Sequence, residues 1–121
     1  MGALVATTPS NSGTVTAGAA VAASDTIAQS IIGQRGALLR INNGNASPDA
    51  VTISDSGVTG AGNALSANAG ANGAAVADSI TNGTAQIYVI RPEQVNPSTG
   101  VVTITHSVTS TVTYELWPLS F

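Results

Sequence analysis

Apolar and polar residues alternate along two runs near the C-terminal end of the chain. In residues 101–108 and 111–119 every second position carries a large apolar side chain or His106, and threonine is frequent between them. Successive side chains of a strand point to opposite faces of its sheet. The alternation therefore predicts two half-buried strands, with inward residues Val102, Ile104, His106 and Val108 in the first and Val112, Tyr114 and Leu116 in the second.

Three further runs, residues 37–42, 51–54 and 85–90, are rich in Val, Ile and Leu and also predict strands. Asn43-Gly44 is a strong turn signal after the first of them. We therefore expect residues 37–42 and 51–54 to form a hairpin with a loop of several residues. Residues 107–110 are short enough for a second hairpin turn, between the last two strands.

The N-terminal third gives a weaker signal. Residues 1–18 are small and largely polar and cannot bury enough surface to fold alone, so they predict an extended arm. Residues 14–16 favour a strand, whereas Ser24 or Asp25 could cap a short helix over residues 26–32. We favour a strand followed by a loop or a short turn.

No run keeps the helical period of 3.6 residues, and turns rich in Gly, Asn and Pro recur at intervals of roughly 8–12 residues. With 121 residues the chain has room for one core only. We predict a single all-β domain over residues 19–121 that folds as an antiparallel β-sandwich. A jelly-roll-like double sheet and a small barrel are the alternatives.

Residues 57–73 consist almost entirely of Gly, Ala, Asn and Ser, with Val58 and Leu65 as the larger apolar residues. The glycines lack the order of a phosphate-binding loop, and no helix pattern follows them. A loop of this length in a compact domain is usually functional or flexible. We favour a segment that becomes ordered against a neighbour, with plain flexibility as the alternative.

Charge limits the classes of partner. Arg35, Arg40 and Arg91 are the basic side chains, and the net charge is −3. Because nucleic-acid binding needs clustered Lys and Arg, this class is excluded, and an anionic membrane surface is disfavoured. No apolar stretch reaches the ~18 residues of a membrane-spanning helix. The absence of cysteine excludes disulfides and thiolate chemistry.

Candidate chemistry is sparse. His106 is the one imidazole, and its place on an apolar strand face favours a packed histidine over a general base. Asp49, Asp55 and Asp78 border Asn-rich loops and could offer oxygen ligands to Ca²⁺, but they lack the spacing of a calcium loop. Turn and capping roles explain them better. We therefore predict no enzyme activity, no cofactor and no metal site.

Composition indicates assembly. Aromatic residues make up 3% of the chain and charged residues 7%. Few side chains are therefore available that contribute about 1.5–3 kcal/mol each on burial, and a surface with few charges is cheap to desolvate. The monomer core should be thin and completed by neighbours. In the tail, Trp117, Leu119 and Phe121 would share one side of an extended chain, which either folds over its own sandwich or docks on another subunit.

The hairpin-like LLRINNGN and VTI segments and the ending VTITHSVTSTVTYELWPL carry a resemblance over residues 36–119. In length and pattern the chain resembles the capsid decoration (cement) proteins of tailed bacteriophages. The resemblance implies a β-rich homo-oligomer, with a trimer favoured, that binds the major capsid protein. It also implies synthesis in the bacterial cytoplasm and residence on the capsid exterior, where the protein bridges neighbouring capsid subunits and the arm lies along the shell.

The candidate interface residues are Leu4, Val5 and Pro9 in the arm, Leu65 in the Gly-rich segment, and Trp117, Leu119 and Phe121 in the tail. Two other classes of function remain open. A carbohydrate- or receptor-binding β-sandwich of a phage fibre or tail would use Tyr88, Tyr114 and Trp117 as aromatic platforms. A hydrolase built on His106 ranks third.

Overall fold

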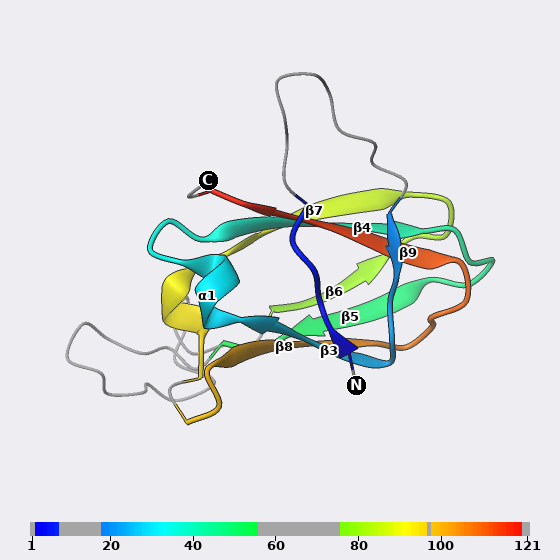
Figure 1. Cartoon of the computed structure of the whole chain (residues 1–121). Helices are drawn as coiled ribbons and strands as arrows, with labels where there is room; N and C mark the ends of the chain where they lie inside the picture. The colour runs from blue at the N-terminus through cyan, green and yellow to red at the C-terminus, as the bar shows by residue number, and fades with distance from the viewer. Residues whose placement is uncertain (1, 8–17, 56–75, 97, 120–121) are drawn as a thin grey trace, which may run out of the picture.

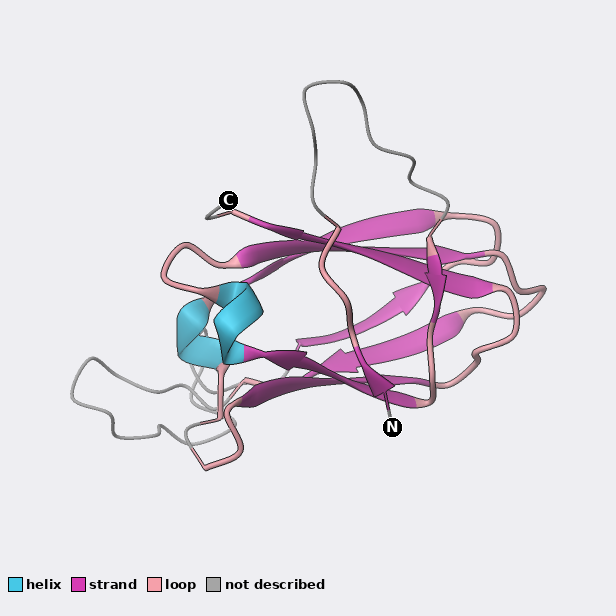
Figure 2. Ribbon diagram, in the orientation of Figure 1, coloured by secondary structure: helices cyan, strands magenta, loops and turns pink. Residues whose placement is uncertain are grey.

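The chain folds into two β-sheets packed face to face (Figures 1 and 2). The computed structural model describes residues 2–7, 18–55, 76–96 and 98–119. In spatial order, the five-stranded sheet contains β1 (Gly2–Ala3), β3 (Ser24–Ala28), β8 (Val101–His106), β5 (Asp49–Ile53) and β6 (Val76–Ile80). The four-stranded sheet contains β2 (Ala19–Ala20), β9 (Val112–Pro118), β4 (Ala37–Asn43) and β7 (Ala85–Ile90). Short helical segments are α1 (Gln29–Ile32) and the 3-10 helix η1 (Pro92–Gln94).

The predicted all-β sandwich is confirmed. All strand pairings described are antiparallel except that of β1 with β3, which is parallel. Within the described ranges the two sheets remain separate, so the small-barrel alternative is not formed. The strand predicted at residues 14–16 and the Gly-rich residues 57–73 lie outside the part of the chain that the structure describes.

Aliphatic side chains from alternate positions of both sheets fill the interior. Burial alternates residue by residue along β4 and β5, as expected where one face of each strand meets the core. The inward residues predicted for the last two strands are confirmed: Val102, Ile104, His106, Val112, Tyr114 and Leu116 are buried, and Val108 packs against the core just beyond β8.

Both predicted hairpins are wrong. β4 pairs with β7 and β9 in one sheet, whereas β5 pairs with β6 and β8 in the other. The segment after Asn43 therefore carries the chain across the sandwich, over the roughly 10 Å that separates stacked sheets. Residues 107–111 make the same crossing from β8 to β9. Alternation fixes which side chains face the core, but two strands facing that core from opposite sheets show the same pattern as two strands of a hairpin.

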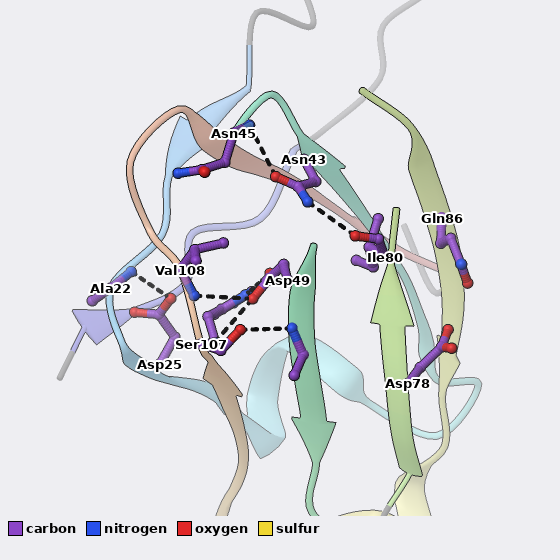
Figure 3. Close-up of polar contacts among 12 residues, drawn as sticks. Ala22, Asp25, Asn43, Asn45, Asp49, Asp78, Ile80, Gln86, Ser107 and Val108 are labelled. Carbon is purple, nitrogen blue, oxygen red and sulfur yellow. Dashed lines mark hydrogen bonds and ion pairs between the residues drawn. The ribbon is translucent and has the colours of Figure 1, made fainter. Parts of the chain in front are cut away.

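Asn43 holds the first crossing in place. Its buried side-chain Nδ2 donates to the carbonyl oxygen of Ser47 at 3.0 Å. Nδ2 also donates to the Ile80 carbonyl oxygen at 2.9 Å, and Oδ1 accepts from the backbone N–H of Asn45 at 2.9 Å (Figure 3). One amide thus satisfies polar groups of the loop and of β6, which would otherwise be buried without partners. The Asn-Gly turn signal was correctly located, and it marks a crossing instead of a hairpin.

Residues 2–7, the first described part of the expected arm, lie against both sheets of the sandwich. This N-terminal strap pairs with β3 through β1 and then crosses to the other sheet, where the Thr7 N–H donates to the Leu116 carbonyl (Figure 1). Between these points Leu4 is buried in the core and the Val5 N–H donates to the Tyr114 hydroxyl at 2.8 Å. The strap covers one open side of the sandwich, where Leu4 joins the hydrophobic core. Residues 8–17 are outside the described ranges.

Two elements were not anticipated in their observed positions. Ser24–Ala28 is a strand that passes directly into the short α1, whereas the strand of this region was predicted at residues 14–16, outside the described ranges. Asp25 does not cap a helix, because its buried carboxylate accepts from the Ala22 N–H at 2.9 Å at the start of the strand. β6 was not predicted, since Asp78 in its centre interrupts the apolar signal.

Gly36 provides a test of the close packing between β4 and the end of β7. Its φ is +87°, and a Cβ there would collide with the Ile90 carbonyl oxygen, whereas Gly83 has a φ of +77° with open space around it. We expect Gly83→Ala to cost about 1–2 kcal/mol from the backbone conformation alone. Gly36→Ala should cost clearly more, because the Ile90 backbone must also move. Urea unfolding of both variants measures the difference, and equal costs would contradict the close approach.

Candidate interaction surface

The outward faces of the two sheets differ in character. On the five-stranded sheet the outward positions of the long strands hold small or hydroxyl-bearing side chains: Ser24, Thr26, Ala28, Val101, Thr103, Thr105, Ala50, Thr52, Ala77 and Ser79. None of these residues is among the exposed large apolar side chains of the described structure. This face has no feature that requires a partner.

The outward face of the four-stranded sheet carries large apolar side chains. Trp117 of β9, Leu38 of β4 and Val89 of β7 lie side by side across three neighbouring strands, as the strand register shows. Ile87 lies two residues from Val89 on the same face of β7. Val89 is 61% exposed and Ile87 63% exposed, while Leu38 and Trp117 are half-buried. We call these four residues the apolar patch. A contiguous exposed group of this kind typically marks an interaction site.

The ion pair between Arg40 and Glu115 borders the apolar patch. Arg40, which lies opposite Ile87 on β4, donates through Nη1 to Glu115 Oε1 on β9 at 3.0 Å. The Glu115 side chain is almost covered, so the pair is held against the sheet. Because each charge already has a partner, the surface around the patch presents little net charge to an approaching molecule.

The predicted interface residues fall into three groups. Leu4 is buried in the core and is not available to a partner, which corrects that assignment. Val5 is 70% exposed on the strap, and Trp117 and Leu119 lie at the end of β9, where Leu119 is partly exposed. Pro9, Leu65 and Phe121 lie outside the described residues.

Ile87 and Val89 were missed as surface residues. Residues 85–90 read as a nearly continuous apolar run, and such a run predicts a strand buried on both faces. The structure instead places this strand at the edge of its sheet with one face in solvent. The sequence did carry a signal for this surface. Successive side chains of a strand alternate between faces, so Ile87 and Val89 must lie on the face opposite Tyr88 and Ile90.

His106 and Asp49 form the most chemically distinctive pair in the described part of the chain. His106 Nδ1 lies 2.6 Å from Asp49 Oδ2, and the His106 side chain is 2% exposed. The second oxygen of Asp49 accepts from the backbone N–H groups of Ser107 and Val108, at 3.0 and 3.3 Å (Figure 3). The pair thus fixes the end of β8 and the start of the crossing that follows it.

This arrangement differs from a nucleophile–base–acid triad. The Ser107 Oγ accepts from the Ala50 N–H at 2.8 Å, and neighbouring residues of an extended segment point to opposite sides. His106 has almost no exposed surface through which a substrate could approach it. The buried imidazole that sequence reasoning favoured is confirmed.

The three candidate calcium ligands do not converge. Asp49 binds His106, Asp55 pairs with Arg91 at 2.7 Å, and Asp78 accepts from the Tyr88 hydroxyl. Across the described ranges no group of three or more His, Cys, Asp or Glu residues could hold a metal ion. Within those ranges, too, no helix has the length and apolar character to cross a membrane.

Tyr88 connects the two sheets at the side opposite the strap. Its hydroxyl donates to Asp78 Oδ2 at 2.8 Å, from β7 to β6. Burial raises the pKa of the Tyr88 phenol far above its ordinary value, and the hydrogen bond to the Asp78 carboxylate and its negative charge raise it further. The neutral phenol is therefore the form that the fold stabilises.

Comparisons with protein-family models, with curated proteins and with solved structures found no match for this chain.

Removing the Asp49 carboxylate should be strongly destabilising. Asp49→Ala leaves a buried imidazole and two backbone N–H groups without their acceptor, a change that costs about 3–5 kcal/mol for buried pairs. Asp49→Asn keeps an acceptor in place and should cost less. Urea unfolding followed by circular dichroism measures both, and an alanine variant within about 1 kcal/mol of the wild type would contradict this structural role.

The Asp78–Tyr88 contact should appear in an alkaline titration. We expect Asp78→Asn to lower the pKa of Tyr88 towards its ordinary value, because the negative charge is removed while burial remains. Since the folded-state pKa is raised, the contribution of Tyr88 to stability is present below pH ~10 and is lost as the pH rises through the folded-state value. Phenolate absorbance measures the titration, Tyr88→Phe identifies the signal, and Glu93→Gln serves as the control. An unchanged pKa in Asp78→Asn would refute the assignment.

Proposed function

We propose that this chain is a structural virion protein that binds the outer surface of a phage capsid and bridges neighbouring capsid subunits. The observation that carries the proposal is the contrast between the two outer faces of the sandwich. The five-stranded sheet presents small and hydroxyl-bearing side chains, and the four-stranded sheet presents the apolar patch. A module with one apolar face and one hydrated face suits attachment to a larger protein surface. We identify that larger surface as a phage capsid because the sequence resembles capsid decoration proteins.

The distribution of charge supports a protein partner. The exposed apolar side chains of the patch lie beside the compensated Arg40–Glu115 pair, so docking there desolvates little uncompensated charge. Trp117 is the one tryptophan of the chain, and aromatic residues near the centre of an interface often contribute most of the binding energy. The apolar patch is therefore the surface that we assign to the major capsid protein.

The structure weakens the carbohydrate-binding alternative. Sugar recognition on a sandwich surface needs exposed aromatic rings, and two of the three candidates face inward. Tyr114 is buried and its hydroxyl accepts from the Val5 N–H, while Tyr88 faces β6 and donates to Asp78. Trp117 alone remains on an outer face, and it lies among aliphatic neighbours.

Co-sedimentation with empty capsids of the cognate phage, stripped of the chain, tests the proposal. We expect wild-type protein to bind saturably and Trp117→Ala to bind at least about tenfold more weakly, a typical loss when a tryptophan that anchors an interface is truncated. Thr105→Ala on the opposite face is the matched control and should bind normally. Thermal unfolding of each variant verifies that it is folded.

Three results would overturn the proposal or its surface. Wild-type protein that does not bind the capsid excludes the virion role. Equal binding by folded Trp117→Ala excludes the apolar patch as the attachment surface. Weakened binding by Thr105→Ala places the contact on the hydroxyl-rich face instead.

A further inference from the structure

β7 forms a free edge of the four-stranded sheet among the described residues. The Asn43 N–H donates to the Thr84 carbonyl at 2.9 Å, which identifies that pair as hydrogen-bonded in the antiparallel ladder. Hydrogen-bonded pairs recur at every second residue, so Gln86, Tyr88 and Ile90 direct their backbone groups towards β4. The backbone N–H and C=O groups of Ala85, Ile87 and Val89 therefore point away from the sheet, where they make no hydrogen bond within the described ranges.

The other sheet edges have features that prevent pairing with another chain. β1 and β2 contain two residues each, which is too short to template a long partner strand. β6 carries Asp78 on its inward face, and an inward-pointing charge at an edge is a known protective feature. β7 has six residues, pairs with β4 in continuous register and contains no charge, lysine or proline. It is the long unprotected edge of the described structure.

The same residues that present free backbone groups also present exposed apolar side chains. Ile87 and Val89 have their side chains on the outer face and their N–H and C=O groups on the free edge. A strand added beside β7 would satisfy the backbone groups and cover part of the apolar patch in one step. Such an addition gives main-chain hydrogen bonds together with cross-strand side-chain contacts.

We propose that β7 pairs antiparallel with β7 of a second copy of this chain, so that two four-stranded sheets join into one continuous sheet. With the two-fold axis at Ile87, the two Ile87 side chains lie opposite each other and Val89 lies opposite Ala85 of the second copy. All three residues then fall in hydrogen-bonded pairs, because each presents its backbone groups to the free edge. The surface is complementary to itself, as a two-fold interface requires.

Charge favours a second copy as the occupant. β7 is uncharged, so antiparallel self-pairing brings no like charges together. The nearest charge on the outer face, Arg40, is compensated by Glu115, and Asp78 on the inner side accepts from Tyr88. The outer row then runs Glu115, Arg40 and Ile87, followed by the same residues of the second copy in reverse order. The two arginines are separated by both isoleucines.

Two consequences distinguish this pairing from the trimer that the sequence resemblance favours. An antiparallel edge pair closes with two subunits and has no free equivalent edge for a third. One strand pair also buries less than the ~1,600 Å² of a standard interface, so the dimer should dissociate on dilution. The proposal concerns the purified chain alone and does not depend on capsid binding.

Sedimentation velocity and residue-resolved hydrogen exchange over a concentration series test the pairing. We expect a monomer–dimer equilibrium, with the Ile87 and Val89 amides exchanging rapidly in dilute protein and at least about tenfold more slowly in concentrated protein. The Gln86, Tyr88 and Ile90 amides, which face β4, should be protected at every concentration. Val89→Lys should abolish the dimer, because it places a charge in the apolar row of each copy. Thr52→Lys, on the exposed face of β5, is the matched control and should leave the equilibrium unchanged.

Each alternative result overturns the proposal. Ile87 and Val89 amides that exchange rapidly at all concentrations show that the edge stays open, whatever the oligomeric state. A dimer or trimer that persists in Val89→Lys uses another surface. If Val89→Lys fails to fold, Ile87→Lys at the two-fold position replaces it, and a dimer retained in that variant equally excludes the pairing.

Discussion

The fold depends on a single layer of mostly aliphatic side chains shared by two sheets. Ile27, Leu39, Ile53, Ile104 and Leu116 come from five different strands and are all fully buried in it. Each strand supplies a side chain only at alternate positions, so neither sheet could cover its own inward face. Repeated crossings between the sheets follow from this requirement. The strap adds Leu4 at one side, where the layer would otherwise meet water.

The buried polar groups maintain these crossings. Asn43 binds the loop after β4, and Asp49 binds the segment after β8, so these two crossings are each held by a buried side chain whose hydrogen bonds are satisfied. Asp49 and His106 belong to residue types that are common in catalytic sites, but they share no other feature with such a site. Their burial and their contacts indicate that the fold uses them to position the backbone.

The sequence was sufficient for the fold class and for most long strands, because alternation with period two directly reports a strand with one buried face. Ala85–Ile90, Val101–His106 and Val112–Pro118 were located to within about two residues. Sheet membership was not predictable, since Ile41 and Val51 face the same core from opposite sides and show identical patterns. The contacts of the strap were not predictable, because the parallel pairing of Gly2–Ala3 with β3 depends on residues distant in the sequence. The exposure of Ile87 and Val89 was not predicted, because they belong to a nearly continuous apolar run and their exposure depends on the position of that strand in the sheet.

The hydroxyl-rich face of the five-stranded sheet has a consequence for any particle that bears this protein with its other face inward. Thr52, Thr103 and Thr105 would then form the boundary with the medium, and none of them carries charge. The outward face of such a coat attracts few counterions and presents an uncharged, hydrated surface in place of the charges of the underlying shell. Adsorption of the particle to charged materials would be governed by this layer and no longer by the shell beneath it.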